Sequence, residues 1–432
     1  MSSPVAGLLF PVAFVGTLFG AGIVSLADPL VARGSMVYFA GGILAMLVFM
    51  AVAQAAGSCF RPGAAERKGR VFSALRLLPA ARWLGLLGGG FIALDLFLSI
   101  PYRELDLVAI RQGFAQRQPT LFAYPGNLLA PCALMALGLT LLYYERIHPL
   151  KRLAGLFVGL GVPIMTALGL GGRNYIFDLL VMVPWWLLQR PLRRAPVVPR
   201  RFSWRVLAPA AALLLFVALA LISMMRSPEG ADQYEAVILL NRDAVTLEPR
   251  LQEKLRALRP ELATILSEAF FYWSAAVPTF DKVYAHWRLP PTWLSPFSPL
   301  LHRRLSAWGI APSSEQVTEH YGRIVWPYGI WPNGFSTASK DMIVALGRAG
   351  GLLAQALLGL AAGLLFVLSR KRCDFMMSFL SSVFFLVFFL WFQGGTLGHP
   401  LYEYALYYGI VYLLLRRWFM FSFSPSLDER QH

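Results

Sequence analysis

The sequence contains few charged residues and few cysteines, and each shortage excludes a class of protein. Only 14% of its 432 residues are charged, whereas soluble globular chains carry roughly 25%, so a soluble enzyme is excluded. The hydrophobic content of 57% is too high for a disordered chain. Cys59, Cys132 and Cys373 provide neither a disulfide framework nor a CxxC metal pair. HExxH, GxSxG and Walker sequences are also missing, so protease, hydrolase and ATPase functions have no motif behind them.

Long apolar runs make up most of the chain. Several reach about 20 residues, which is the length a helix needs to cross a bilayer core of ~30 Å. The pattern predicts an all-α polytopic membrane protein with about ten transmembrane helices. The expected spans are 6–26, 36–57, 83–101, 124–144, 153–170, 173–188, 206–225, 342–368, 375–393 and 401–415.

The formal net charge of +16 comes mainly from short basic segments on one side of these spans. More than half of the 39 Lys and Arg residues follow the second, fourth, sixth, eighth and tenth spans. The positive-inside rule therefore predicts that both termini are cytoplasmic. Orientation explains most of the charge, so we expect no nucleic-acid partner. No Lys or Arg precedes the first apolar run, so we expect residues 6–26 to be a retained span and no cleaved signal peptide.

The spans divide the chain into three parts. Residues 1–225 would form transmembrane helices one to seven, and residues 342–432 would form helices eight to ten and a cytoplasmic tail. Residues 226–341 would form a large outer loop, which contains no cysteine and must be held together by packing. Within this loop, apolar residues at helical spacing predict a helical region near 248–270 that is interrupted at Pro260. They are Leu251, Leu255, Leu258, Leu262, Ile265 and Ala269.

A shorter outer loop at 102–123 contains the sequence RELDLVAIRQGF. This sequence predicts a helix lying on the membrane surface.

Ionisable residues inside the predicted spans gather near their outer ends. Asp95 lies about six residues below the end of span three, and Asp178 lies about one turn below the end of span six. Arg348 lies about two turns into span eight, among glycines. Such residues are costly in a bilayer and mark function by default. The alternative is that each is an isolated structural group, paired with a neighbour or reaching water.

Arg173 follows Gly171 and Gly172 at the outer mouth between spans five and six. The positive-inside rule disfavours an arginine there, and the glycines allow a ligand to approach the backbone closely. Because a guanidinium binds two phosphate oxygens at once, Arg173 is a candidate to bind a lipid diphosphate. Asp95 or Asp178 is expected to support an arginine and to take no direct part in the chemistry.

Aromatic residues are concentrated in the second half of the large loop. Half of the twelve tryptophans, including Trp326, lie between Trp273 and Trp331. Aromatic faces stack on the apolar faces of sugar rings, but tryptophan also forms the interfacial belt of membrane proteins. His320 lies near Arg323 and is a candidate base, since a neutral imidazole can accept a proton from a sugar hydroxyl. A lone histidine in an outer loop is also often structural.

Three segments resemble motifs of the Wzy-type bacterial polysaccharide polymerases, the oligosaccharide repeat-unit polymerases. GGRNYIFDLL resembles the Gly-x-Arg turn of that family, and YWSAAVPTFDKVY resembles its tyrosine, small-residue and Pro-x-Phe-Asp segment, with Tyr272 and Asp281. WPNGFSTASKDMIVALGRAGGLL resembles its Asn- and Thr-containing stretch before a glycine-rich span, with Asn333. Arg348-Ala349-Gly350 stands where the family often has Asp-Phe-Gly, so any role of that acid is in doubt.

The resemblance implies a GT-C-like architecture and a glycosyltransferase of the bacterial inner membrane. Its donor would be a growing glycan on undecaprenyl diphosphate, its acceptor one lipid-linked repeat unit, and its product an exopolysaccharide, such as a xanthan-like polymer, or O-antigen. No cofactor or metal is expected, because arginines can neutralise the diphosphate and only Asp28 lies in the first outer loop, where no carboxylate pair occurs. A chain-length regulator (a polysaccharide co-polymerase) and a flippase are the implied protein partners.

The candidate residues fall into three roles. His320, Arg173 and Arg323 are the catalytic candidates, as base and as diphosphate-neutralising groups. Asp95 and Asp178 are the supporting candidates. The substrate-binding candidates are Arg348, Asn333, Asp281, Tyr272 and Trp326.

Two other functions compete with the polymerase. An O-antigen ligase would use the same donor with a different acceptor, and the sequence does not separate the two. A secondary transporter or flippase would have broken helices at matching positions in two halves and charges near the bilayer midplane. The sequence pattern indicates neither feature.

Overall fold

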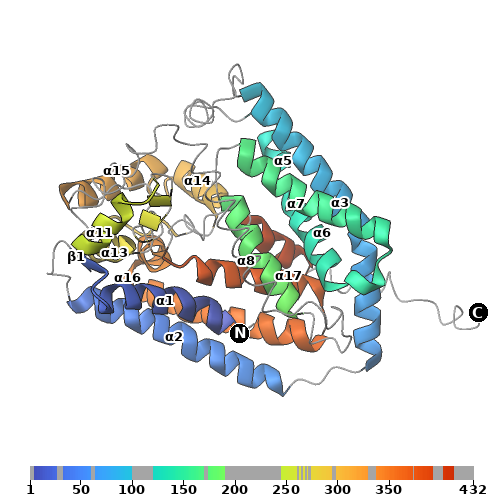
Figure 1. Cartoon of the computed structure of the whole chain (residues 1–432), viewed down its shortest axis with the longest axis horizontal. Coiled ribbons are helices and arrows are strands. Elements are labelled where there is room, and N and C mark those ends of the chain that lie inside the picture. Colours follow the sequence, from blue (N-terminus) through green and yellow to red (C-terminus); the bar gives the residue numbers. More distant parts are fainter. Residues whose placement is uncertain are drawn as a thin grey trace, which may run out of the picture.

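The structure is a computed structural model. It describes residues 4–26, 33–59, 64–99, 120–169, 174–189, 245–259, 262–263, 266–267, 270, 274–293, 298–328, 337–372, 374–392 and 402–412. These residues are predominantly helical and form a bundle with a group of shorter helices at one end, at the left of Figure 1. We refer to this end as the loop end.

The helices of the bundle are mostly long and apolar. Five are long and apolar enough to cross a membrane: Arg33–Gly57, Leu75–Ser99, Ala123–Leu142, Pro149–Ala167 and Ala338–Arg370. The bundle elements are α1 (Pro4–Gly20), α2 (Arg33–Ser58), α3 (Ala64–Ser99), α5 (Ala123–Leu129), α6 (Pro131–Leu142), the 3₁₀ turn η1 (Tyr144–Arg146), α7 (Pro149–Gly169), α8 (Asn174–Gln189), α16 (Ala338–Arg372), α17 (Phe375–Phe389) and a last helical segment at 402–412.

In the described part of the chain, each predicted span overlaps helical residues, but 124–144 is divided between α5 and α6, and 342–368 contains a break in α16 at Gly347. The span 206–225 lies outside the described residues. Two boundaries differ from the prediction. Helix α3 begins at Ala64 rather than at residue 83, because the basic segment before the apolar run is rich in Ala, Arg and Leu and continues the helix. Helix α1 ends at Gly20, and residues 24–26 of the first predicted span form a strand.

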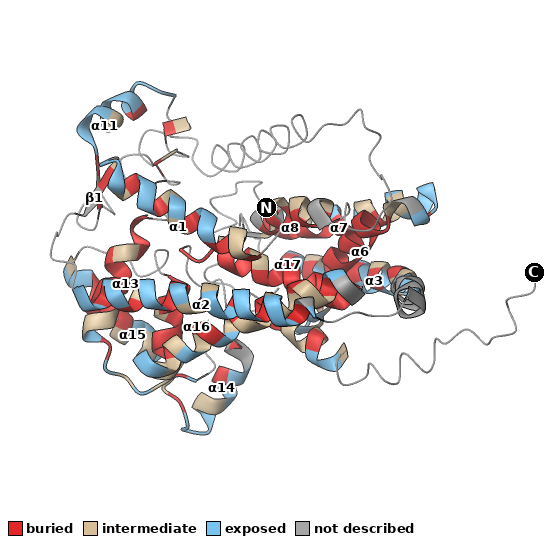
Figure 2. Ribbon diagram, turned by 90° about the horizontal axis from the view of Figure 1, so that it is seen from below, coloured by how far each residue is buried: buried red, intermediate tan, exposed pale blue. Residues whose placement is uncertain are grey.

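Helix α17 lies at the centre of the bundle, where Figure 2 shows it almost wholly buried. Its sequence is apolar apart from Ser378, Ser381 and Ser382, which share one face and are buried like most of the helix, as expected for a helix surrounded by others. It packs against α1, α8 and α16. Asp374 accepts a hydrogen bond from the Met377 amide at 3.2 Å and caps its first turn, and the Tyr412 hydroxyl donates to the same carboxylate at 2.7 Å. Asp374 therefore caps the first turn of α17 and joins it to the helical segment 402–412.

Helices α2 and α16 run side by side and approach closely at small residues. A side chain at Gly359 would meet the backbone of Met46, and one at Gly363 would meet the backbone of Met50. Small residues permit such contact between membrane helices, where packing and not the hydrophobic effect drives association. This pairing fixes the depth of every α16 residue relative to α2.

The loop end contains α11 (Pro249–Arg256), α13 (Ala276–His286), α14 (Pro299–Ala307), α15 (Ser314–Val325) and the 3₁₀ turn η3 (Trp326–Tyr328). A two-stranded sheet joins it to the bundle: β1 (Val24–Leu26) pairs antiparallel with β2 (Val245–Leu247), with Ser25 opposite Thr246. The sequence analysis did not predict this sheet. Its strands, together with Leu255, Val283 and Val325, belong to a second apolar core separate from that of the bundle.

The predicted helical region near 248–270 is confirmed in part. Helix α11 begins with Pro249 in its first turn and ends at Arg256, and helical residues resume at 262 beyond Pro260. Leu255 is buried as predicted, but Leu258 lies past the helix end and is exposed. The surface helix predicted within 102–123 lies almost entirely outside the described residues.

Candidate functional site at the break in α16

Helix α16 is broken at Gly347, whose φ of 72° and ψ of 179° are not helical. The break reverses the chain direction. The Ser339 hydroxyl donates to Gln355 Oε1 at 3.1 Å, although sixteen residues of straight helix would separate them by about 24 Å. The segments 338–346 and 348–372 therefore lie side by side in a V, with Gly347 at its tip. The second arm alone is about 37 Å long, enough to cross a bilayer.

The base of the V is fixed inside the bundle by hydrogen bonds. The Trp391 indole donates to the Ser339 hydroxyl at 3.1 Å, and the Ala338 amide donates to the Trp391 carbonyl at 2.9 Å. Gln355 packs against Gly42 of α2, where any larger residue would collide with its amide. The sequence analysis missed Gln355, which is fully buried. The first arm is therefore a short helix that runs from the bundle to Gly347, and the second arm returns from there into the bundle.

The break leaves carbonyl groups of the first arm without their helical partners, and a segment of the loop end satisfies them. The amides of Thr292 and Trp293 donate to the carbonyls of Val344 at 3.1 Å and Ala345 at 2.8 Å. An unsatisfied buried carbonyl would cost about 1–3 kcal/mol. The segment 287–293 is thus a structural part of the V.

Arg348 lies directly after the break and is exposed. Its guanidinium donates to the Tyr284 carbonyl at 2.6 Å and lies 4.4 Å from the centre of the Tyr284 ring. The Tyr38 hydroxyl donates to the Arg348 carbonyl at 2.9 Å. No carboxylate in the described part of the chain pairs with Arg348, and a guanidinium has five N–H donors, so it can still bind an anion. Its position differs from the prediction, because the break puts it at the tip of the V and not two turns into a span.

Asp281 and Lys282 lie on α13, which packs against the first turn of α2. The Ser35 hydroxyl donates to Asp281 Oδ1 at 2.5 Å, and Lys282 Nζ lies 3.9 Å from Asp281 Oδ2. Lys282 also lies 4.2 Å from the centre of the Tyr328 ring. Asp281 is only 3% exposed. In this structure the residue predicted to bind substrate joins α13 to α2.

His320 lies on α15 against the segment 287–293. Its Nε2 accepts the Arg288 amide at 3.3 Å, which places the ring proton on Nδ1, and its ring meets the edge of Trp287 at 5.0 Å between centres. Partial burial, with a smaller contribution from the Arg323 charge, holds the pKa of His320 below its ordinary value. The imidazole is therefore neutral near pH 7, which a general base requires.

An open hollow of about 620 Å³ lies between α14 and α15, within the size range of ligand pockets. One face of α15 provides its polar wall, because the spacing i, i+3, i+4, i+7 aligns side chains on a helix. These are Gln316, Glu319, His320 and Arg323. Leu289 and Pro290 of the segment 287–293 also line it. The hollow and the tip of the V are therefore connected by one short stretch of chain.

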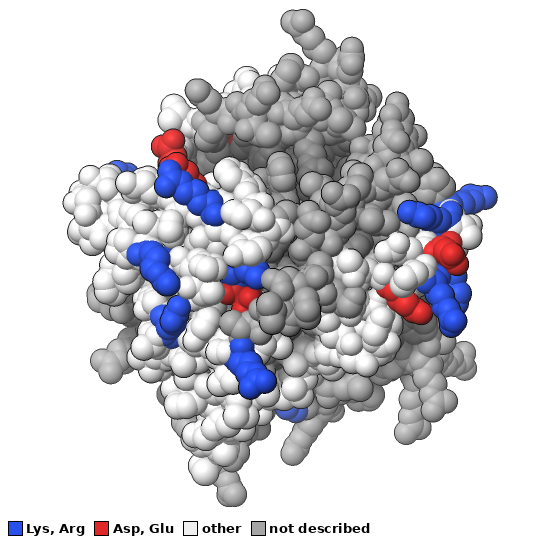
Figure 3. Space-filling model, turned by 90° about the vertical axis from the view of Figure 1, so that its left-hand side faces the viewer, with Lys and Arg blue, Asp and Glu red and all other residues white. Residues whose placement is uncertain are grey.

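Arg323 and Trp326 are both exposed on α15 and at its end. Arg323 pairs with Glu319 at 2.5 Å across one helical turn, a partner that the sequence analysis did not identify. The Trp326 ring lies over Gly322 and is 59% exposed, so its face is open to a ligand. Figure 3 shows this end of the molecule, where Lys and Arg side chains are spread among uncharged residues with few acidic ones.

A second charged pair lies in the first arm of the V and was also missed. Lys340 Nζ lies 3.0 Å from Asp341 Oδ1 and 4.7 Å from the centre of the Tyr321 ring. Burial raises the pKa of the Tyr321 hydroxyl above its ordinary value, against the effect of the Lys340 charge. Lys340 and Asp341 belong to the STASKD stretch of the third segment that resembles the polymerase family. The sequence alone does not indicate that they lie beside α15, because this depends on the reversal at Gly347.

The two supporting candidates lie on other helices of the bundle. Asp95 is buried near the end of α3 and accepts two hydrogen bonds at 2.8 Å, from the amide and the hydroxyl of Thr120. It thereby joins α3 to Thr120, which lies just before α5, and Figure 1 shows α3 and α5 on the side of the molecule away from the loop end. Asp178 is buried in the second turn of α8. The predicted pairing of either residue with Arg173 involves residue 173, which lies outside the described residues.

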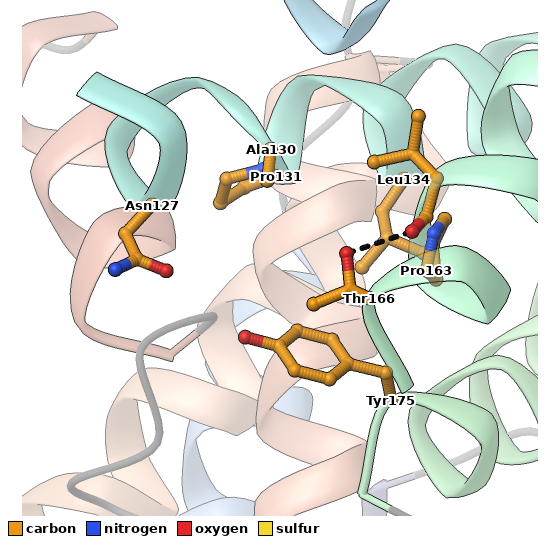
Figure 4. A pocket seen from close by; sticks show the side chains of 8 residues that line it. Asn127, Ala130, Pro131, Leu134, Pro163, Thr166 and Tyr175 are labelled. Atoms are coloured by element: carbon orange, nitrogen blue, oxygen red, sulfur yellow. Dashed lines mark hydrogen bonds between the residues drawn. The ribbon is translucent and has the colours of Figure 1, made fainter. Parts of the chain in front are cut away.

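A small cavity lies among α5, α6, α7 and α8. Figure 4 shows Asn127, Thr166 and Tyr175 around it, with Thr166 bonded at 2.8 Å to a carbonyl of its own helix. Its volume of about 20 Å³ has room for roughly one water molecule. This cavity is too small for a substrate.

Of the other candidate residues, Arg173, Tyr272 and Asn333 lie outside the described residues. In the part of the chain that is described, no three His, Cys, Asp or Glu residues are grouped as metal ligands would be. Comparisons with protein-family models, with characterised proteins and with solved structures found no match to this chain.

Proposed function

We propose that this chain is a membrane glycosyltransferase that polymerises lipid-linked oligosaccharide repeat units, in the manner of the Wzy-type polymerases that its motifs resemble. The observation that carries the proposal is the V of α16, with an exposed arginine at its tip and no carboxylate beside it among the described residues. A lipid diphosphate has its anionic head at the membrane surface and its chain in the bilayer. In this proposal the exposed guanidinium of Arg348 binds such a head.

The proposed reaction joins two lipid-linked glycans. A hydroxyl of the acceptor repeat unit attacks the anomeric carbon of the donor glycan, the bond from that carbon to the diphosphate oxygen breaks, and undecaprenyl diphosphate leaves. His320 is neutral and takes the hydroxyl proton at Nε2, after release of the Arg288 amide contact. Arg348 neutralises the charge that develops on the leaving diphosphate. Arg173 is proposed to assist it.

The hollow beside α15 is proposed to hold the acceptor. Its wall combines amide, carboxylate, imidazole and guanidinium groups with apolar residues, and sugars need both kinds of contact. Trp326 lies at the end of the same helix with its ring exposed. In this arrangement Asp281 keeps α13 in place and binds no substrate.

The proposal includes an orientation. The loop end faces the periplasm, both termini face the cytoplasm, and the ten helical segments form a GT-C-like bundle in the bacterial inner membrane. The basic segments that follow alternate helices support this orientation. Alkaline phosphatase is active only in the periplasm. A fusion within 257–259 should therefore be active, and a fusion at 194 should be inactive.

The broken helix also bears on the transporter alternative. The sequence indicated no pair of broken helices at matching positions, and the structure shows a break at Gly347 of α16. A transporter of the inverted-repeat type would have a matching break in its other half. Among the described helices before residue 190, α1, α2, α3, α7 and α8 have no such interruption. The span Ala123–Leu142 is divided between α5 and α6 at Ala130, but Ala130 keeps a helical φ of −54° and ψ of −37°, so the chain does not reverse there.

Deletion of the gene tests the proposed function. Cells lacking the protein should accumulate single repeat units on undecaprenyl diphosphate, while polymer disappears. Accumulation of finished polymer on the lipid, with none transferred to lipid A core, would instead identify a ligase. Unchanged lipid-linked glycans would contradict both.

A further inference from the structure

Trp293 is the one residue other than glycine, in the part of the chain that is described, with a positive φ. The value is +56°, in the left-handed region that bulky L-residues avoid because their side chains crowd the backbone. Such strained residues persist only where the surrounding structure fixes them, and they gather at functional sites. The strain at Trp293 therefore calls for a cause.

Backbone contacts explain how the strained conformation is held. The Trp293 amide donates to the Ala345 carbonyl at 2.8 Å, and the preceding Thr292 amide donates to Val344 at 3.1 Å. Both carbonyls were freed by the break at Gly347. These contacts need only the backbone, so they require no particular side chain at position 293.

Packing does not explain the tryptophan either. Its side chain is 49% exposed, whereas Trp287 in the same segment is 9% exposed and belongs to the apolar core of the loop end. A glycine at position 293 would adopt the same φ without strain and would keep both backbone hydrogen bonds. The tryptophan is thus a large aromatic surface held in an unfavourable conformation and presented to the outside.

We propose that Trp293 is the platform on which the first sugar of the lipid-linked donor stacks. Its amide donates to the Ala345 carbonyl, three residues before Arg348, so the Trp293 backbone lies against the segment that leads to the residue proposed to bind the diphosphate, to which that sugar is attached. Pro290 lines the hollow beside α15 and precedes Trp293 by three residues, so the two lie within about 10 Å of each other along the chain. This inference rests on the proposed function and adds a sugar subsite to it.

Equilibrium binding to the full chain in lipid nanodiscs tests the inference, with two probes. One is undecaprenyl diphosphate, and the other is the same lipid with one repeat unit. The wild-type chain should prefer the glycosylated lipid by about tenfold. Trp293→Gly should lose this preference, keep the affinity for the bare lipid, and unfold at the same or a higher temperature. Trp293→Tyr should retain most of the preference.

Trp308→Gly is the matched control, since Trp308 is also exposed but has an ordinary φ of −88°. It should keep the wild-type preference. If Trp293→Gly keeps the preference as well, the sugar subsite is wrong and the proposed function stands. If Trp293→Gly unfolds at a lower temperature and loses both ligands, Trp293 is structural and the inference fails. If the wild-type chain binds neither lipid, the proposed function itself fails.

Discussion

The bundle core and the loop end of this protein are held together by different chemistry. In the bundle, α17 is mostly apolar and buried, and α2 meets α16 at glycines, so shape and close contact carry most of the packing. At the loop end, buried ion pairs and a helix cap hold the short helices and the first arm of α16, and hydrogen bonds join the loop end to the residues around Gly347. The bundle resembles a structural frame, whereas the loop end retains cations, a hollow and a strained tryptophan. Groups that can react or bind are therefore found where apolar packing alone does not dictate the structure.

The largest effect should follow removal of Asp281. Asp281→Ala leaves Lys282 buried without its carboxylate and removes the bond to Ser35, and breaking a buried pair in this way costs about 3–5 kcal/mol. Thermal unfolding in detergent should show a clear loss of stability. Asp281→Asn still offers an oxygen to Ser35 and should lose less. An unchanged unfolding temperature with lost activity would restore Asp281 to a substrate-binding role.

A somewhat smaller effect is expected in the bundle. Gly359→Ala places a methyl group against the Met46 backbone and forces α2 and α16 apart, which should cost about 1–3 kcal/mol. Gly41→Ala is the control, since that position faces open space and alanine favours a helix by about 0.5–1 kcal/mol. Equal unfolding temperatures for the two variants would show that the close contact does not carry the packing.

Arg348→Lys should slow the reaction without unfolding the chain. Lysine keeps the charge but lacks the planar fork that binds two phosphate oxygens. Loss of one charge-assisted hydrogen bond, about 1.5–3 kcal/mol, should reduce the rate at least about tenfold. The rate of chain growth in membrane vesicles measures this change. Arg304→Lys, at an exposed arginine of α14, should have the wild-type rate, and the same rate for Arg348→Lys would remove Arg348 from the site.

His320 should give the activity a distinctive pH dependence. Burial and Arg323 lower the pKa of His320, so the acid limb of the pH profile should lie below about 6.5, the ordinary value for histidine. The neutral form stabilises the fold above that value, and this contribution is lost as the pH falls and the unfolded chain binds the proton more readily. Arg323→Gln should move the limb upward. A limb unchanged in His320→Gln would exclude His320 as the base.

The smallest effect is expected for the Glu319–Arg323 pair. Both side chains are exposed, so water and salt screen their attraction, and a double-mutant cycle on thermal unfolding should yield about 0.3–0.5 kcal/mol. The value should shrink at high salt. A coupling free energy several times larger between Glu319 and Arg323 would show that water and salt do not screen this pair as expected for exposed side chains.

The sequence predicted the helices well, because apolar runs of span length have few alternative structures. It predicted the interruption near Pro260 for the same local reason, whereas the depth of Asp95 in a membrane stays a prediction. The β1–β2 pairing was missed, since it joins residues more than two hundred positions apart. The reversal at Gly347 was missed too, although Gly347, Gly350 and Gly351 had marked the region as unusual.

The candidate site was less predictable than the fold, because its residues acquire their roles from contacts between distant segments. Asp281 stood in a motif, yet its contact with Ser35 depends on α13 reaching the start of α2. Lys340 and Asp341 follow one another in sequence, but only the V brings them to Tyr321. The φ of Trp293 has no sequence signal, since tryptophan is not a residue that marks a left-handed turn.

The most direct test of the central claim, that the tip of α16 serves glycan polymerisation, is a reconstitution with one substrate. The purified chain in vesicles receives a single lipid-linked repeat unit, and the products are separated by size. We predict a ladder of products for the wild-type chain and no ladder for Arg348→Ala at the same protein abundance. A ladder of equal length and yield from Arg348→Ala, or no ladder from the wild-type chain, would contradict the account.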